Sequence, residues 1–95
     1  MVLTVDKVKQ HLRIDYDEED TLIESLIRQA QAAAEDFCRV SFDGEDVPEP
    51  VRLACLLFVS YHYENRDIPD MTTYKSMRMA FEHLLYPHRD PAQMF

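Results

Sequence analysis

The chain has 95 residues, of which 46% are hydrophobic and only one is glycine, and its net charge is −8. This length allows one small domain, and the hydrophobic content is that of a folded protein. The scarcity of glycine argues against phosphate-binding loops, and the excess of acid disfavours binding nucleic acid through its phosphates, which requires Lys and Arg.

The first half of the chain predicts two helices, at about residues 5–12 and 18–39. Thr4 is a candidate N-cap for the first helix, and we expect Asp17 to cap the second. The second helix has a broad apolar stripe opposite a polar face, as in a helix packed on a core. Its stripe includes three small residues that let another helix approach closely: Ala30, Ala33 and Ala34.

The third predicted helix follows an irregular loop near residues 41–48 and extends to Tyr63. Pro50 lies in its first turn, where proline is well tolerated. Its apolar residues point in several directions, so we expect burial on more than one side. A chain of this length has little surface to cover such a helix. We therefore predict contact with another subunit, with at least one of Leu56, Val59 and Tyr63 substantially exposed in the isolated subunit.

Arg66 is a further interface candidate, because it follows the third helix near its C-terminus. It complements the helix dipole there or forms a fixed ion pair. A fourth helix is predicted at about residues 74–85, capped by Thr72 or Thr73 and ended by Pro87.

The predicted fold class is all-α: a small bundle of about four helices at residues 1–86, followed by an extended C-terminal tail at 87–95. Chain termini are usually disordered unless they are tied down, and a segment that orders on binding can cover a large surface. We expect the tail to be a docking element separate from the fold. The candidate docking residues are Pro87, Arg89, Met94 and Phe95; packing of Phe95 on the subunit's own core is the alternative.

No residue pattern indicates an enzyme, a metal site or a cofactor site. The acids at 17–20 lack the spacing of a calcium-binding loop, and His62, His83 and His88 lack that of a zinc site. Cys38 and Cys55 lie on apolar helix faces, which favours buried free thiols and a reducing compartment. The longest apolar run has seven residues, too few to span a membrane.

Several segments in the same order make the chain similar to a known family. It resembles the head–tail connector proteins, or head-completion adaptors, of long-tailed bacteriophages, often labelled DNA-packaging proteins. The segments that carry the resemblance are Leu3, Val8-Lys9, Leu12-Arg13-Ile14-Asp15, Asp17 to Asp20 before Leu22-Ile23, then Leu26, Ile27 and Ala30, then Pro50-Val51 through Ala54 and Leu57 to Tyr63-Glu64-Asn65-Arg66, and finally Leu84-Leu85, Pro87 and Arg89. His88 departs from the family's usual aromatic residue, and residues 67–83 match no family pattern.

The resemblance implies a structural virion protein without enzyme activity. Its subunits would form a ring, usually dodecameric, that docks beneath the portal after genome packaging, extends the DNA channel and receives the next head-completion or tail protein. The partners implied are further copies of the chain, the portal and that downstream protein, with DNA only as passing cargo and no membrane. The protein would be made in the bacterial cytoplasm and end at the head–tail junction of the virion.

The distribution of acid fits such a channel, because like charge prevents the DNA backbone from adhering. The candidate channel-facing residues are Asp17, Glu18, Glu19 and Asp20. The alternative function is an acidic DNA mimic that inhibits a nucleic-acid-binding protein. Residues 1–46 hold 12 acids against 5 bases, and this clustering, with a very apolar third helix, disfavours a mimic that spreads acid along one face.

Overall fold

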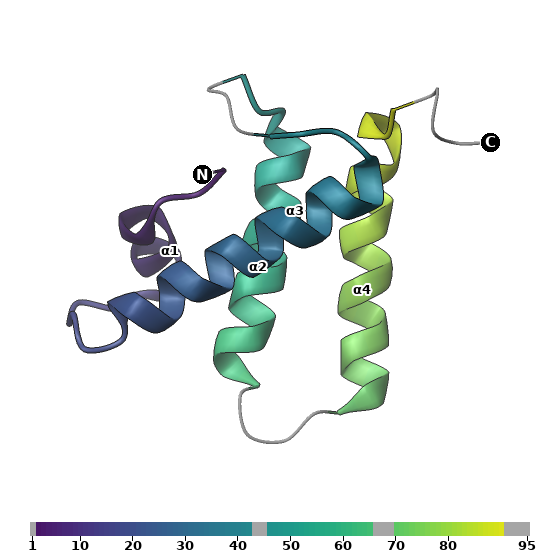
Figure 1. Ribbon diagram of the computed structural model, residues 1–95. Coiled ribbons are helices and arrows are strands. Elements are labelled where there is room, and N and C mark those ends of the chain that lie inside the picture. Colours follow the sequence, from purple (N-terminus) through teal and green to yellow (C-terminus); the bar gives the residue numbers. More distant parts are fainter. Residues whose placement is uncertain (1, 43–45, 66–69, 91–95) are drawn as a thin grey trace.

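The computed structural model describes residues 2–42, 46–65 and 70–90. These form four α-helices, α1 (Val5–Leu12), α2 (Asp20–Cys38), α3 (Glu49–Glu64) and α4 (Met71–Leu85), and a short 3-10 helix, η1 (Tyr86–His88). Helices α3 and α4 are antiparallel neighbours, α2 crosses α3, and α1 lies beside α2 (Figure 1). The described residues contain no strand, which confirms the predicted all-α class.

The first helix begins where the sequence predicts, but the second does not. The Thr4 hydroxyl accepts a hydrogen bond from the backbone N–H of Lys7, which caps α1. The N-cap of α2 is Glu19, so the prediction that Asp17 caps this helix is wrong. The reason is that the Asp17 carboxylate pairs with the Lys9 ammonium at 2.5 Å instead of accepting from the first turn of α2.

Helix α4 starts three residues earlier than predicted, because its cap is Asp70. The Asp70 carboxylate accepts hydrogen bonds from the Thr73 hydroxyl at 2.8 Å and from the Thr72 backbone N–H at 3.0 Å. These two bonds stabilise the ionised form and lower the pKa of Asp70. The predicted caps Thr72 and Thr73 therefore do not cap the helix. Instead, they donate the hydrogen bonds that the capping carboxylate of Asp70 accepts.

The core lies where α2 crosses the α3–α4 pair. Its largest completely buried residues on these helices are Ile23, Ile27, Val51, Val59, Phe81 and Leu85. Ala30 and Ala34 are also completely buried. Cys38 and Cys55 are buried free thiols, as predicted. Burial disfavours the thiolate and raises the pKa of Cys55 to about 12, so this cysteine acts as a small apolar residue.

The structure describes the predicted tail as far as Asp90. The backbone N–H of Asp90 donates to the Cys38 carbonyl at 2.9 Å, which ties the chain to the end of α2. The Arg89 guanidinium lies 4.9 Å from the centre of the Phe37 ring. Arg89 and Asp90 thus contact the C-terminal end of α2, which offers an aromatic ring and a carbonyl that no longer has a partner within the helix. Met94 and Phe95 lie outside the described residues.

Candidate assembly surfaces

One face of α3 is only partly covered by the rest of the subunit. Val51, Ala54, Cys55 and Phe58 recur at helical spacing and face the core, where all four are buried. Leu53 falls on the opposite side of the helix, and its side chain is 54% exposed. An exposed leucine beside further apolar groups marks a surface that a partner can cover.

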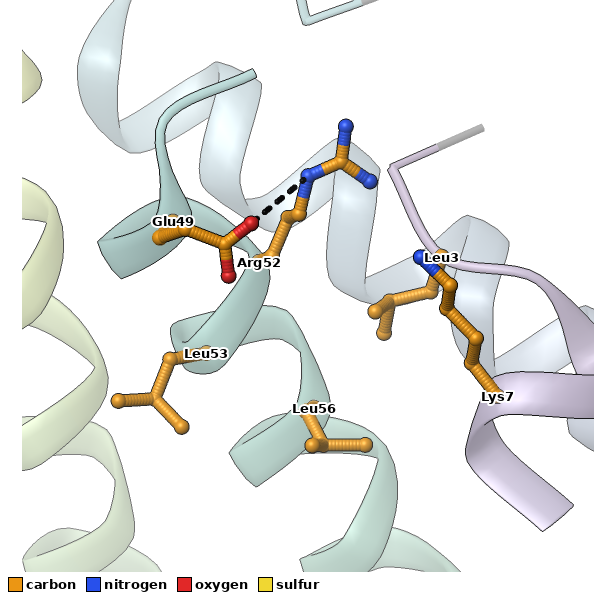
Figure 2. A pocket seen from close by; sticks show the side chains of 6 residues that line it. All are labelled: Leu3, Lys7, Glu49, Arg52, Leu53 and Leu56. Carbon is orange, nitrogen blue, oxygen red and sulfur yellow. Dashed lines mark ion pairs between the residues drawn. The ribbon is translucent and has the colours of Figure 1, made fainter. Parts of the chain in front are cut away.

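Leu53 and Leu56 help to form a hollow of about 200 Å³ between α3 and the N-terminal segment (Figure 2). Leu3 provides a third apolar wall, and Lys7 of α1 lies at the rim. Arg52 holds the hollow in shape, because its guanidinium donates to the Val2 carbonyl at 2.9 Å and lies near the Glu49 carboxylate. The result is an apolar floor with a charged rim, the usual anatomy of a protein–protein contact.

A second hollow, of about 430 Å³, lies between α3 and α4. Leu57 and Ser60 line it from α3, and Ser76 and Ala80 line it from α4. Leu53, Leu57 and Ser60 are spaced i, i+4 and i+7, so both hollows lie along the same face of α3. Ser60, Ser76 and Ala80 contribute small side chains to its lining.

The four predicted interface residues differ in how far the structure buries them. Leu56 and Tyr63 are half-buried, and Leu56 lines the first hollow. Val59 is completely buried on the core-facing side of α3, so the prediction that at least one of Leu56, Val59 and Tyr63 is substantially exposed depends on Leu56 and Tyr63. Arg66 lies outside the described residues. Leu53 was missed, although the spacing of Val51, Ala54, Cys55 and Phe58 already places it opposite the buried face.

The four acidic candidates gather around the turn that joins α1 to α2. The Lys9 ammonium pairs with Asp17 at 2.5 Å and with Asp20 at 2.9 Å, and these hydrogen bonds raise the pKa of Lys9. Glu18 is exposed. The acids at both ends of this short segment are therefore paired with one lysine of α1.

Two tyrosines anchor the same turn to α3. The Tyr63 hydroxyl donates to Glu19 at 2.6 Å, and the Tyr16 hydroxyl donates to the same carboxylate at 3.2 Å. The two hydroxyl oxygens are 3.3 Å apart. Donation to Glu19 is the main reason that the pKa of Tyr63 is raised, since the bond favours the protonated phenol. The turn is thus held by contacts from both α1 and α3.

A third hollow, of about 420 Å³, lies at the C-terminal ends of α2 and α4. We call it the C-terminal hollow; its lining residues are Phe37, Met79, Glu82, His83, Tyr86 and Arg89. Met79 is 72% exposed and Tyr86 is 55% exposed. The Arg89 guanidinium lies 4.9 Å from the Phe37 ring centre and 5.9 Å from that of Tyr86, and its Nε atom is buried without a hydrogen-bond partner among the described residues.

Within residues 2–42, 46–65 and 70–90, no group of three or more His, Cys, Asp or Glu side chains is placed to hold a metal ion. No helix in that part of the chain has the length and apolar character needed to cross a bilayer. The described residues form a small helical subunit whose surface has three hollows.

Comparison with known proteins gives one match. A family model for phage gp6-like head-tail connector proteins matches residues 2–89 of the chain. The match covers α1 to α4, η1 and all three hollows. Neither the curated proteins nor the solved structures contain a match.

Proposed function

Because the chain belongs to the phage gp6-like head-tail connector family, it is a structural protein of a phage virion, and we propose that it forms a ring beneath the portal. The ring docks after DNA packaging, extends the DNA channel and receives the next head-completion or tail protein. A dodecamer is the proposed stoichiometry, and the protein is made in the bacterial cytoplasm before assembly. No enzyme activity is part of this function. The alternative of a DNA mimic finds no support in the family.

The partly covered face of α3, with its exposed Leu53, is the observation that carries the proposed ring. A ring requires each subunit to present a surface that a neighbour covers. Leu53 and Leu56 provide an apolar floor on that face, and the groove beside Leu57 continues it toward α4. Covering this face removes apolar area from water, at roughly 25 cal/mol for each Å² buried. Leu56 and Tyr63 remain interface candidates, now joined by Leu53.

The acidic turn is the proposed channel-facing surface, with Asp17, Glu18, Glu19 and Asp20 as its residues. Its negative charge repels passing DNA, and its contacts with Lys9 and Tyr63 keep it from moving into the channel. We expect no binding of random-sequence duplex DNA at about 150 mM salt, where phosphate contacts from Lys and Arg would be required. Micromolar binding under these conditions would contradict the channel role.

The ring is tested by replacing Leu53 with Asp. A charged group on the apolar floor must be desolvated when a neighbour binds, so Leu53→Asp should prevent assembly while the helix content stays unchanged. Ala32→Asp is the matched control, because Ala32 is exposed on the opposite layer, in α2. Light scattering and electron microscopy report assembly of each protein, alone and with portal rings of the phage that encodes it. A wild-type chain that neither assembles nor binds portal would refute the proposed function.

A further inference from the structure

The outer side of α4 is exposed along most of the helix. The buried residues Met77, Phe81 and Leu85 recur on one side of α4 and face the core. The opposite side carries four exposed residues at helical spacing, which we call the α4 stripe: Lys75, Met79, His83 and Tyr86. The Met79 side chain is 72% exposed and that of Tyr86 is 55% exposed. Because Met and Tyr are enriched at protein interfaces, this stripe favours a protein partner.

The outer side of α3 forms a second stripe of the same length. We call it the α3 stripe; its residues are Leu53, Leu56, Leu57, Ser60 and Glu64. Residues 53 and 64 are 11 positions apart, as are residues 75 and 86, so each stripe extends over about 16 Å of helix. Three of the five large apolar residues exposed in the described part of the chain lie on the two stripes: Leu53, Met79 and Tyr86. Packing one stripe on the other would therefore cover most of this exposed apolar surface.

Each stripe has one charged residue that forms no ion pair among the described residues. The neighbouring charges are paired within the subunit: Arg52 with Glu49, and Arg78 with Glu82. This leaves Glu64 on the α3 stripe and Lys75 on the α4 stripe, both exposed and opposite in sign. The charges therefore favour a contact between the two stripes. A contact of the α3 stripe with a second α3 stripe would leave Met79 and Tyr86 exposed.

An antiparallel register brings the two charges and the apolar residues together. When Glu64 lies opposite Lys75, each step back along α3 matches one step forward along α4. The register then has these opposing pairs: Glu64 with Lys75, Ser60 with Met79, and Leu53 with Tyr86. A parallel arrangement with the same ion pair would place Leu53 beyond the start of α4, where no residue of the α4 stripe can cover it.

The antiparallel direction is also the one that a ring provides. Helices α3 and α4 are antiparallel neighbours within one subunit (Figure 1). Rotation about an axis that runs along these helices keeps the direction of every copy, so α4 of one copy and α3 of the next are antiparallel too. Because the contact joins two different surfaces, it repeats from copy to copy and closes a ring when the rotation allows.

We propose that the α4 stripe of one subunit packs on the α3 stripe of the next in this antiparallel register. The Met79 side chain lies over Ser60, because the small serine leaves room that a flexible methionine can fill. The Tyr86 ring covers Leu53, the exposed leucine of α3. The inference rests on the proposed ring and names the surface that covers α3 in it.

Charges support both ends of this contact. At one end, Glu64 and Lys75 form an ion pair between subunits. At the other end, Lys7 is exposed at the rim of the first hollow, beside Leu53. It then faces the C-terminal end of the neighbour's α4, where the helix dipole is negative and favours a cation.

Disulfide formation between two single-cysteine variants tests the register. A Ser60→Cys chain is mixed with an isotope-labelled Met79→Cys chain under mild oxidation, and mass spectrometry identifies the heterodimer. We expect this product, because the two positions lie opposite each other and a disulfide requires Cα atoms within about 7 Å. The native Cys38 and Cys55 are buried and do not compete. The matched control uses Thr72→Cys, an exposed site about 10 Å along the same side of α4, and should give none.

Charge exchange tests the ion pair without weakening the fold. Glu64→Lys and Lys75→Glu should each weaken association about fivefold, and the combined variant should restore it, as measured by sedimentation. Glu64 ends α3 and Lys75 lies near the start of α4, so each substitution improves the match to its own helix dipole. A loss of association therefore cannot come from a weaker helix. Unchanged association in both single variants would contradict the register.

Hydroxyl-radical footprinting tests which part of α4 is covered. In the assembled protein, Met79 should lose its reactivity. Met71 is 64% exposed but lies beyond the Glu64 end of α3 in this register, so it should stay reactive.

The outcomes distinguish the inference from the proposed function. Rings that form without the heterodimer, with Met79 still reactive, overturn the inference and leave the connector role intact. Disulfides between two Ser60→Cys chains would show that α3 pairs with itself, which also overturns it. Protection of Met79 in dilute monomers would mean that the chain covers its own α4, and protection on portal rings without the heterodimer would assign α4 to the portal; both overturn the inference. Absence of any association, alone or on portal rings, overturns the proposed function and the inference with it.

Discussion

The surroundings of His62 disfavour its charged form. Its imidazole lies 4.3 Å from the Phe58 ring and 5.2 Å from the Tyr61 ring, measured between ring centres. Its Nε2 atom is buried without a hydrogen-bond partner among the described residues. Burial, together with the nearby charge of Arg78, lowers the pKa of His62. The folded protein therefore favours the neutral imidazole.

This shift predicts a pH dependence of stability with a definite sign. Because the pKa of His62 is lower in the folded state, the unfolded chain binds more protons once the pH falls below its ordinary value of 6.5. The free energy of unfolding should fall as the pH drops through this region and stop falling, for this group, below the folded pKa. Urea denaturation at several pH values measures it. His62→Phe should flatten the curve there; an unchanged slope would contradict the assignment.

At the scale of elements, small residues set how closely α2 can approach its neighbours. Ala30 and Ala34 of α2 and Ala54 of α3 are completely buried where the two helices cross. Interiors of this kind are packed like organic crystals, so a larger side chain must displace its neighbours. The alanines of α2 are thus needed for the close approach of α2 and α3, and they also favour the helical conformation.

Replacing Ala30 by Leu tests this packing. The added methyl groups should force the helices apart and lower the free energy of unfolding by about 1–3 kcal/mol. Ala32→Leu is the control, since Ala32 is exposed on the same helix, and it should change stability by less than about 0.5 kcal/mol. Chemical denaturation of both variants gives the comparison. Equal effects would show that α2 and α3 do not pack tightly at Ala30.

A second prediction at the scale of elements concerns the contact between the acidic turn and α3. Tyr63→Phe removes the hydroxyl that donates to Glu19, so the turn should lose one of its anchors. Hydrogen exchange of the backbone amides at 15–20 should become faster, with little change in melting temperature. Tyr61→Phe, whose hydroxyl bonds near the start of α4, should leave that exchange unchanged. Unaltered exchange in Tyr63→Phe would mean that α1 alone holds the turn.

The sequence predicts the helices well because their apolar spacing is a local property. It does not predict the start of α4, because Asp70, Thr72 and Thr73 can all serve as its N-cap. Which of them caps the helix depends on which adopts the extended backbone conformation of a cap, and in the structure this is Asp70. It also does not predict the bond between Glu19 and Tyr63, which are 44 residues apart. That contact depends on the crossing of α2 and α3, which no local pattern determines.

The helical spacing of α3 contained more information than its apolar composition suggested. Taken together, its residues predict burial on several sides, but the spacing of Val51, Ala54, Cys55 and Phe58 already defines one buried face. Leu53 lies outside that face, and Val59 lies close to it. The direction in which each residue of α3 points predicts Leu53 as the exposed residue, whereas the apolar composition of the helix does not.

At the scale of the whole molecule, the subunit is a flat body of 43 × 33 × 17 Å. Its acidic turn precedes α2, whereas its C-terminal hollow is lined by Phe37 at the other end of that helix. A flat subunit with different surfaces at its two ends is suited to repetition in one direction.

Removal of residues 91–95 should separate folding from docking. The shortened chain keeps Arg89 over the Phe37 ring and the bond between Asp90 and Cys38, so its melting temperature should stay nearly unchanged. Attachment to portal-bearing heads should weaken if Met94 and Phe95 dock there, as we predict. A fall of several degrees in melting temperature with normal attachment would instead show that Phe95 packs on the subunit's own core.

The bond between the Asp90 N–H and the Cys38 carbonyl makes the following residues a tether with a fixed origin. Five residues lead from Asp90 to Phe95, and a fully extended chain of that length reaches at most about 18 Å. Any pocket that receives Met94 or Phe95 must therefore come within this radius of the C-terminal end of α2. Lengthening the tether after Asp90 would widen the reach but dilute the effective concentration of its apolar end at the pocket.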